Sequence, residues 1–503
     1  MKELEQIRIL QLGPSDLSKE YPLYEGTEWF YEPDITEKPD AWYDMAFLCR
    51  SINEAEREYL FANVSAYRLF YLDTVRLNGP TDWIVRSRKG EKITESDLPE
   101  MLLKTPRYYF SRPYGEKKYI SNLNIAPNFH GSIKWNGFTG AVLEGDFGAT
   151  FTQTAYWRYP SPLGETGMET WLEYHKEGNV EISLKVTQFA AGSPDGIKEI
   201  RNYSEKDLEE LIYIENNFTR TGFLFISLSA KGSGRLEVVG LHTRLTRMGR
   251  GSFLPGGERF VTDDREEVFF YFDPGDMQPP LNVYFSGYKT QEGFEGYYMM
   301  RRMGCPFVLV SEPRLEGGAF YLGSEEYEHM IAEKLWEYMN ELCFTPDQVN
   351  LSGLSMGTFG ALYYGCDLHP HSIILGKPLA SLGDIAENER IKRPGGFATS
   401  LDVMWKQYQN TDSSAIESMN ARFWNKFSTA EWGRTKFIIA YMIEDDYDGT
   451  AYRTLLSHLV SDGVMVYGKG LHGRHNDDTN GIVSWFIDRY YNIMKEDFGR
   501  SFD

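Results

Sequence analysis

Over the first hundred or so residues, short apolar runs alternate with one helical pattern. Ile7 to Gly13 (IRILQLG), the segment EWFYEP, Tyr43 to Arg50 (YDMAFLCR) and YRLFYLD have the length and composition of strands. Before the last of these, INEAEREYLFANV places its apolar residues at helical spacing. This alternation predicts a small N-terminal α/β domain with a parallel sheet, over residues 1–125. Its LGPSD turn lacks the GxGxxG spacing, so nucleotide binding is not supported.

From about Ile133 the pattern changes to apolar and polar residues in alternation. Several such runs, separated by Gly, Asn and Ser and with little helical pattern, predict an antiparallel β-sandwich over residues 126–265. Modules of this kind often bind carbohydrate or a partner protein. Trp135, Trp157 and Trp171 are candidates for stacking on a sugar ring, although packing in the core is the commoner role for a tryptophan.

From about Leu281 strands and helices alternate again. LNVYFSGY, CPFVLVSEP, QVNLS, SIILGKP, KFIIAYMI and VMVYG read as strands, and GSEEYEHMIAEKLWEYMNEL reads as a long amphipathic helix. This rhythm predicts an open, mostly parallel sheet over residues 266–503.

The composition narrows the class of protein. A chain of 503 residues is too long for one core, so two or three domains are expected. A formal net charge of −21 repels nucleic acid and anionic lipid, which excludes nucleic-acid binding. The start, MKELEQIRILQLG, lacks the pattern of a signal peptide, and no apolar run is long enough for a transmembrane segment. The four cysteines form no CxxC motif, so a cytoplasmic, reduced protein without disulfides is expected.

The strongest chemical signal is the GxSxG motif from Gly353 to Gly357. It follows a strand pattern and precedes a helix pattern, which is the context of a nucleophile elbow. Small residues permit the tight turn, and the turn raises the hydroxyl of Ser355 above the sheet. The sequence therefore predicts an α/β-hydrolase domain in the C-terminal half, with Ser355 as nucleophile.

A serine nucleophile needs a base, and in α/β hydrolases the acid and the histidine follow the serine along the chain. His369 and His371 come too soon after the elbow, and His458 lies within a helical pattern. His472 and His475 lie in KGLHGRHNDD, a loop between the last strand and the last helix. His475, the nearer of the two to the final helix, is the predicted base, with His472 as the alternative.

The orienting acid should follow the strand KFIIAYMI. Glu444, Asp445, Asp446 and Asp448 all lie there. Asp445 fits the expected distance from the strand end best, and Glu444 is the alternative. Adjacent carboxylates leave this choice open, because a shift of one residue changes which of them points inward.

An oxyanion hole requires two N–H donors. The backbone N–H of Met356, directly after the nucleophile, is one, and the loop after LNVYFSGY supplies the other from Gly287 or Tyr288. The chain contains no HExxH or other metal-ligand spacing, so neither a metal nor a tightly bound cofactor is expected.

Four segments together resemble a known family. GRGSFLPGGERF (Gly249 to Phe260), GLSMGTFGALYYG, YMIEDDYDGTAY and GLHGRHNDDT are similar to the serine-hydrolase-like accessory protein of the accessory Sec secretion system of Gram-positive cocci. The resemblance runs over most of the chain. It matches the family's catalytic serine, acid and histidine to Ser355, to Asp445 or a neighbouring acid, and to His475.

The resemblance implies a cytoplasmic protein that works at the membrane through an export complex. It implies an O-acetyltransferase that modifies N-acetylglucosamine on serine-rich-repeat adhesins, with an acetyl donor as co-substrate. It also implies partnership with other accessory Sec proteins and a dedicated motor ATPase during adhesin export. Two alternatives stay open. One is a carboxylesterase or deacetylase, because water can also resolve an acyl-serine. The other is a non-catalytic scaffold or chaperone.

Overall fold

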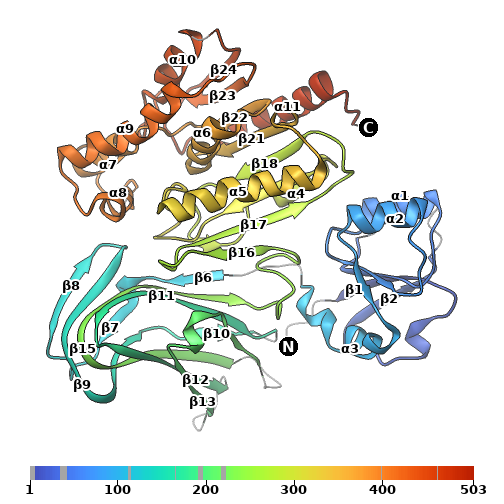
Figure 1. The fold of residues 1–503 in the computed structure, drawn as a ribbon, viewed down its shortest axis with the longest axis horizontal. Helices are drawn as coiled ribbons and strands as arrows, with labels where there is room; N and C mark the ends of the chain where they lie inside the picture. Colours follow the sequence, from blue (N-terminus) through green and yellow to red (C-terminus); the bar gives the residue numbers. More distant parts are fainter. Residues whose placement is uncertain are drawn as a thin grey trace.

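The chain folds around three β-sheets (Figure 1). The structure is a computed structural model, and it describes residues 6–33, 42–110, 115–164, 166–190, 196–216, 222–397, 399–461 and 463–502. Among these residues, none of the helices is both long and apolar enough to cross a membrane.

The N-terminal sheet is parallel throughout, in the order β2-β1-β3-β4-β5. Its strands are β1 (Ile7–Leu12), β2 (Thr27–Tyr31), β3 (Met45–Leu48), β4 (Leu69–Leu72) and β5 (Glu91–Ile93). The helices of this part are α1 (Glu54–Asn63), α2 (Gly79–Ser87) and α3 (Leu98–Leu103). Every residue of β3 is buried, as expected for a central strand with both faces covered. The predicted parallel sheet is therefore confirmed.

The second sheet has eleven strands whose pairings are all antiparallel. They are β6 (Gly115–Lys118), β7 (Leu123–Ile125), β8 (Ser132–Asn136), β9 (Gly140–Trp157), β10 (Ser161–Leu163), β11 (Met168–Gly178), β12 (Glu181–Ala190), β13 (Ile197–Ser204), β14 (Ile212–Ile214), β15 (Gly222–Leu245) and β19 (Gln291–Glu292). The antiparallel pairing matches the sequence pattern.

A sandwich implies two separate sheets, but in the structure these strands form one continuous sheet. Strand β15 has 24 residues; its first half pairs with β12 and its second half with β11, so hydrogen bonding is continuous. Bulges near Gly232 and positive φ angles at Gly232 and Gly234 bend the strand between the two halves. Residues of both halves then share one hydrophobic core. Figure 1 shows the sheet curling back on itself at β9 and β15.

The three tryptophans of this part have different environments. Trp157 and Trp171 are buried, with 1% and 3% of their surface exposed, so they pack inside the protein. The guanidinium of Arg265 lies 3.8 Å from the ring centroid of Trp171. Trp135 on β8 is 49% exposed and is the one of the three that a sugar could reach.

The third sheet has eight strands in the order β16-β17-β20-β18-β21-β22-β23-β24. The pairs β16–β17 and β17–β20 are antiparallel, and the other pairs are parallel. The strands are β16 (Glu258–Val261), β17 (Glu267–Asp273), β18 (Leu281–Phe285), β20 (Phe307–Ser311), β21 (Val349–Leu354), β22 (Ser372–Gly376), β23 (Lys436–Met442) and β24 (Val466–Leu471). This is an α/β-hydrolase-like arrangement, as the C-terminal pattern predicts.

Helices cover both faces of this sheet (Figure 1). One hydrophobic cluster joins Phe285 of β18 to residues of α5 (Glu325–Leu342) and α6 (Met356–Leu368). The neighbouring Tyr284 points to the other face, where it packs with Phe486 and Tyr490 of α11 (Thr479–Phe498). The other helices are α4 (Tyr297–Arg302), α7 (Leu382–Ile391), α8 (Ser400–Tyr408), α9 (Ser413–Thr429) and α10 (Ala451–Ser461).

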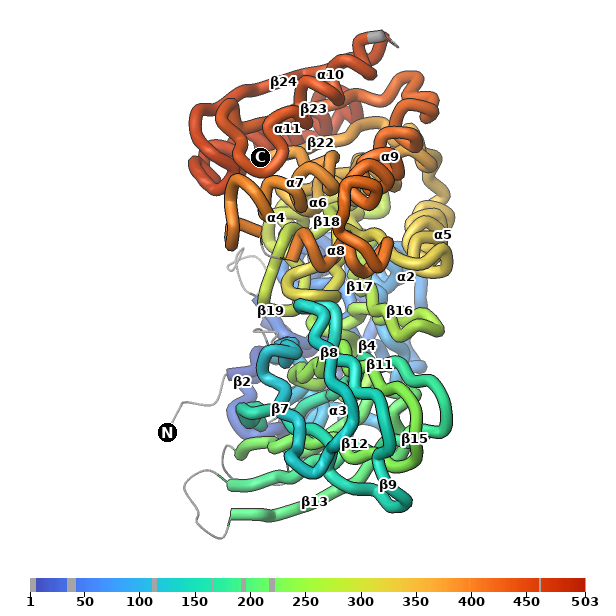
Figure 2. The backbone as a smooth tube through the Cα atoms, turned by 90° about the vertical axis from the view of Figure 1, so that its left-hand side faces the viewer, coloured from blue at the N-terminus to red at the C-terminus, as the bar shows by residue number. Residues whose placement is uncertain are grey.

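Helices α7 to α9 form an insertion between β22 and β23 that reaches the second sheet. Figures 1 and 2 both show α8 above the β8–β9 hairpin. There the Phe138 N–H donates to Asp402 over 2.8 Å, and Lys134 lies over the Trp405 ring. Some short strands also belong to a different sheet from the one that the expected domain limits assign them to. Strands β6 and β7 precede residue 126 and belong to the second sheet, and β16 precedes residue 266 and belongs to the third.

A buried charge cluster lies where the second and third sheets meet. His242 Nδ1 lies 2.5 Å from Glu292, and Arg244 pairs with Glu267 over 2.6 Å and with Glu292 over 2.5 Å. Lys117 pairs with Glu173 over 3.0 Å. The cluster joins strands β6, β11, β15 and β19 of the second sheet to β17 of the third, so buried charge pairing links the two sheets.

Candidate active site

Ser355 occupies a sharp turn between β21 and α6. Its backbone angles are φ 51° and ψ −120°, which a residue with a side chain adopts at a cost. The two motif glycines are required because a side chain at either position would clash with the backbone. A Cβ on Gly357 would lie 2.0 Å from the Phe285 carbonyl oxygen, and one on Gly353 would lie 2.3 Å from the backbone of Gly357. The predicted elbow geometry is therefore present, and Ser355 is only partly buried.

His475 reaches Ser355 from the loop after β24. Ser355 Oγ and His475 Nε2 are 2.8 Å apart, a hydrogen-bond distance. Only 2% of the His475 side chain is exposed, so the imidazole is held away from bulk water. The alternative base, His472, is 85% exposed and pairs instead with Glu444.

Asp445 lies on the other side of the imidazole. Its Oδ2 is 2.8 Å from His475 Nδ1, and its Oδ1 accepts the backbone N–H groups of Tyr447 (2.9 Å) and Asp448 (3.1 Å). Burial raises the pKa of Asp445, but the hydrogen bonds from His475 and the backbone outweigh it and hold the pKa below its ordinary value. Asp445 is therefore a carboxylate at neutral pH.

Glu444 points away from this chain of hydrogen bonds. Its two oxygens accept from His472 (3.1 Å) and from the Gly473 N–H (2.6 Å), and the side chain is 52% exposed. The structure thus brings together Ser355, His475 and Asp445, and it places both sequence alternatives, Glu444 and His472, in a separate exposed pair.

Asp446, one of the four acids considered from the sequence, and Tyr447, which the sequence did not single out, both support His475. Asp446 Oδ1 accepts the His475 backbone N–H over 3.1 Å, and the Tyr447 ring lies against the imidazole with centroids 4.4 Å apart. Both belong to the same EDDYD segment as Asp445. No pattern in the sequence indicates that these two residues contact His475.

The predicted oxyanion donors lie on two segments that meet at the elbow. Met356 N–H is the first of α6, so it has no partner within the helix. The Gly287 N–H donates to Glu295 Oε2 over 2.7 Å. Among the described residues, no hydrogen bond of the Tyr288 N–H is found, so Tyr288 is the better of the two candidates left open for the second donor. Burial raises the pKa of the Tyr288 hydroxyl to about 12.

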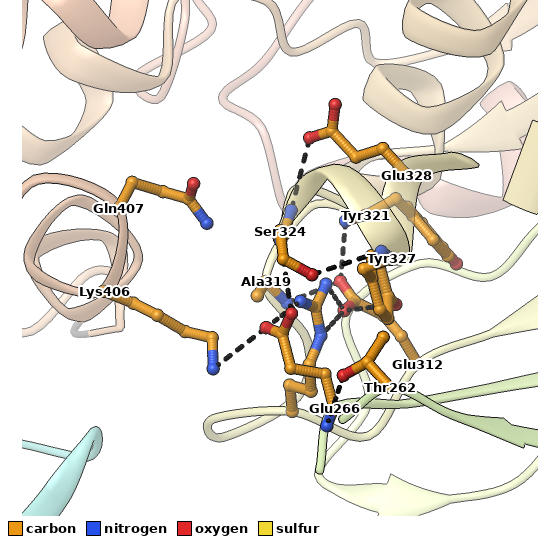
Figure 3. Close-up of polar contacts among 12 residues, drawn as sticks. Thr262, Glu266, Glu312, Ala319, Tyr321, Ser324, Tyr327, Glu328, Lys406 and Gln407 are labelled. Atoms are coloured by element: carbon orange, nitrogen blue, oxygen red, sulfur yellow. Dashed lines mark hydrogen bonds and ion pairs between the residues drawn. The ribbon is translucent and has the colours of Figure 1, made fainter. Parts of the chain in front are cut away.

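The loop that carries Gly287 and Tyr288 rests on a buried polar network. Glu312 accepts the N–H groups of Ala319 (2.6 Å) and Tyr321 (2.7 Å) (Figure 3). It also pairs with Arg314. The Tyr321 hydroxyl then donates to the Ser286 carbonyl oxygen over 2.7 Å, one residue before Gly287. These contacts anchor the start of the loop through the Ser286 carbonyl.

Comparison with known proteins places this chain in a family. The model of the accessory Sec system GspB-transporter family matches residues 7–500. The chain belongs to this family. The match runs through all three sheets and includes every residue of the site.

Three relatives of this accessory Sec system family member cover nearly its whole length. An accessory Sec system protein of Streptococcus gordonii is 37% identical, over 98% of this chain and 99% of the relative. One of Staphylococcus aureus is 36% identical, over 98% of each. A chain of the glycosylation-associated protein complex Gap123 from Streptococcus agalactiae is 35% identical and superimposes with a TM-score of 0.88, over 99% of each chain.

The LPGG segment of this accessory Sec system protein lies between the sheets and not at the serine. Gly251 and Gly256 have positive φ angles, and a Cβ on Gly256 would lie 2.1 Å from the Tyr67 ring. Arg247, just before the segment, donates to the carbonyl oxygens of Phe253 and Phe110. The segment therefore joins the N-terminal part to the rest of the chain.

One group among the described residues could hold a metal ion. Potential ligand atoms of Glu173, His242 and Glu267 lie within 4.8 Å of one another. Lys117 and Arg244 already pair with these carboxylates, and the carboxylates around His242 raise its pKa, which favours its charged form. We therefore interpret the group as part of the buried charge cluster.

Proposed function

We propose that this protein is a serine-dependent O-acetyltransferase that modifies N-acetylglucosamine on serine-rich-repeat adhesins and supports their export. The observation that carries the proposal is the hydrogen-bonded chain of Ser355, His475 and Asp445. Membership of the accessory Sec family gives the export context.

The proposed mechanism begins with attack of Ser355 Oγ on the carbonyl of an acetyl donor, as His475 Nε2 takes the hydroxyl proton. The N–H groups of Met356 and Tyr288 stabilise the oxyanion that forms, and Asp445 stabilises the imidazolium. Collapse of the tetrahedral intermediate breaks the bond to the donor's leaving group, which receives the proton from His475. The product of this half-reaction is an acetyl ester on Ser355.

In the second half-reaction a sugar hydroxyl replaces the donor. His475 takes its proton while the sugar oxygen attacks the acetyl carbonyl, and the proton then returns to Ser355 as the ester moves to the sugar. Water attacking instead gives acetate, which is the carboxylesterase alternative. The overall transfer needs no metal or redox partner, because each step only exchanges an acetyl group and a proton.

The proposal places the protein in the cytoplasm, working with other accessory Sec proteins and the motor ATPase at the membrane. The relative in the glycosylation-associated protein complex Gap123 supports the proposal that this chain also works in a multiprotein assembly. The catalytic residues occupy only the third sheet, so we propose that acetyl transfer and export support are separable. A scaffold without catalysis is the alternative that this separation tests.

The test replaces Ser355 in the producing cell. Ser355→Ala should remove the acetyl groups from the adhesin glycan, measured by mass spectrometry, while the amount of exported adhesin stays near wild type. Glu444→Gln is the matched control and should change neither. Unchanged acetylation in Ser355→Ala would contradict the enzymatic role. Loss of export as severe as in a full deletion would contradict the separation of the two roles.

A further inference from the structure

The segment between α7 and α8 lies against the loop that carries Asp445. We call residues 393–397 the strap. The Arg393 guanidinium lies 4.2 Å from the Tyr447 ring centroid and pairs with Asp446 over 3.2 Å. The Tyr447 hydroxyl donates to the Gly396 carbonyl oxygen over 2.8 Å. The strap is therefore joined to the two residues that also contact His475.

Glu389, near the end of α7, fixes the shape of the strap. This carboxylate is 8% exposed and accepts the Phe397 N–H over 2.8 Å, and it also accepts the Gly395 N–H. Charge-assisted hydrogen bonds of this kind are strong when they are shielded from water. Phe397 thus belongs to a segment held at both ends, and its ring packs against that of Phe320, with centroids 5.5 Å apart.

Phe397 completes a row of aromatic rings across the site. Its centroid lies 5.5 Å from that of Tyr288 and 5.7 Å from that of Tyr447, and Tyr447 lies 4.4 Å from His475. The row thus runs from the loop of the second predicted oxyanion donor to the predicted base. Tyr288 is 39% exposed, and Phe397 and Tyr447 are partly exposed, so the row borders solvent.

A transferase of the proposed kind must favour a sugar hydroxyl over water at the acyl-serine. This requires a surface that holds the sugar ring and excludes water from the acetyl carbonyl. Flat aromatic faces suit the apolar C–H face of a pyranose. We infer that Tyr288, Phe397 and Tyr447 form the acceptor wall of this site, and that Phe397 is the specificity-determining residue that favours transfer over hydrolysis. The inference rests on the proposed function.

The test uses the purified full-length protein and measures how the acyl-enzyme partitions between transfer to the sugar and hydrolysis. p-Nitrophenyl acetate serves as donor and the methyl glycoside of N-acetylglucosamine as acceptor. Release of p-nitrophenol gives total turnover, and mass spectrometry gives acetylated sugar against free acetate. Phe397→Ala should lower the ratio of transfer to hydrolysis about tenfold, a typical effect of one aromatic contact.

Three further variants make the test specific. Phe397→Tyr keeps a flat ring and should restore the ratio, whereas Phe397→Leu keeps apolar volume without a flat face and should not. Tyr298→Ala removes an aromatic ring that is 65% exposed on α4, and it should leave the ratio unchanged.

The outcomes separate the two proposals. A wild-type ratio in Phe397→Ala, with normal turnover, overturns the acceptor wall and leaves the acetyltransferase proposal standing. Loss of all turnover in Phe397→Ala also overturns it, because the strap would then be needed for Ser355 itself. Wild-type protein that hydrolyses the donor but never acetylates the sugar contradicts both the wall and the transferase. Absence of any Ser355-dependent turnover in the wild type contradicts the proposed function from its first step.

Discussion

At the residue scale, neighbouring carboxylates have opposite surroundings. Asp445 is 5% exposed and accepts three hydrogen bonds, from His475 and two backbone N–H groups, whereas Glu444 is 52% exposed and belongs to a surface pair with His472. Both residues follow the end of β23 at Met442, where the chain turns, so that Asp445 faces His475 while Glu444 faces His472 and the Gly473 N–H. Only the inward one can orient the imidazole.

This difference predicts unequal effects of removing the two charges. Asp445→Asn should lower kcat for p-nitrophenyl acetate about 10⁴-fold, because the imidazole loses its orienting partner and its imidazolium loses the carboxylate. Glu444→Gln should stay within about twofold of wild type, since exposed pairs contribute little. Steady-state kinetics checks both. A large loss in Glu444→Gln with a small one in Asp445→Asn would exchange their roles.

The sequence predicted Ser355 and His475 because each has a local signal: a GxSxG between a strand and a helix, and a glycine-rich loop before the last helix. It left Asp445 and Glu444 open because a register shift of one residue is invisible without the strand end. The sequence also did not decide between Gly287 and Tyr288 as the second oxyanion donor. The hydrogen bond from Gly287 to Glu295, which separates the two, is visible only in the folded structure. Phe397 had no signal, since its role depends on rings far apart in sequence.

At the element scale, the junction of β21 and α6 sets the position of the nucleophile. Helix α6 starts directly against β18, which is why a Cβ on Gly357 would meet the Phe285 carbonyl at 2.0 Å. The contact is with the backbone of a central strand, so it cannot relax by moving a flexible side chain. The glycine therefore determines how closely the helix approaches the sheet.

Gly357→Ala should accordingly displace the elbow. We expect the rate of labelling by a fluorophosphonate to fall at least about 100-fold, because a shift near 1 Å is enough for such a loss, and the free energy of unfolding to fall by about 1–3 kcal/mol. Gly90→Ala is the control, because its Cβ would meet only a Val85 methyl at 3.3 Å and a Leu69 methyl and the Val85 Cα at 3.4 Å. Kinetic labelling and urea unfolding measure the two quantities. Wild-type labelling in Gly357→Ala would contradict the argument.

The same scale shows why the second sheet was harder to predict than the first. Parallel strands joined by helices produce a local alternation of strand and helix patterns in the sequence, and this alternation predicted the N-terminal sheet correctly. The continuity of the second sheet depends on the bend in β15, and the sheet also includes β19, whose Gln291 pairs with Glu116 of β6 from 175 residues away. Period-two alternation predicts strands and antiparallel pairing but carries no information on which strands join into one sheet.

At the scale of the whole molecule, the buried charge cluster couples the second and third sheets. Burial alone lowers the pKa of His242, but Glu292, Glu267 and Glu173 outweigh it and raise the pKa. Burial raises the pKa of the nearby Glu169 to about 7. His242 in its charged form thus compensates the surrounding carboxylates, and removing that charge leaves buried negative charge unbalanced.

The cluster makes stability depend on pH. A histidine with a raised pKa stabilises fully below its unfolded value, about 6.5, and this contribution is lost as the pH rises through the folded value. Glu169 acts in the same direction at lower pH, because its pKa is raised from an ordinary value of 4.5 to about 7 and its contribution is lost as the pH rises between those two values. His242→Gln should therefore lower the unfolding free energy at pH 6 by about 3 kcal/mol and flatten its decline from pH 6 to 9. Urea unfolding at several pH values tests this, and an unchanged slope in the variant would contradict it.

The central claim is that His475 activates Ser355, and covalent labelling tests it most directly. Purified wild-type protein and Ser355→Ala are treated with a fluorophosphonate probe, and the intact mass of each is measured. The account predicts a single adduct on the wild type and none on Ser355→Ala. An unlabelled wild type, also in the presence of its partner proteins, or an equal adduct on both proteins would contradict it.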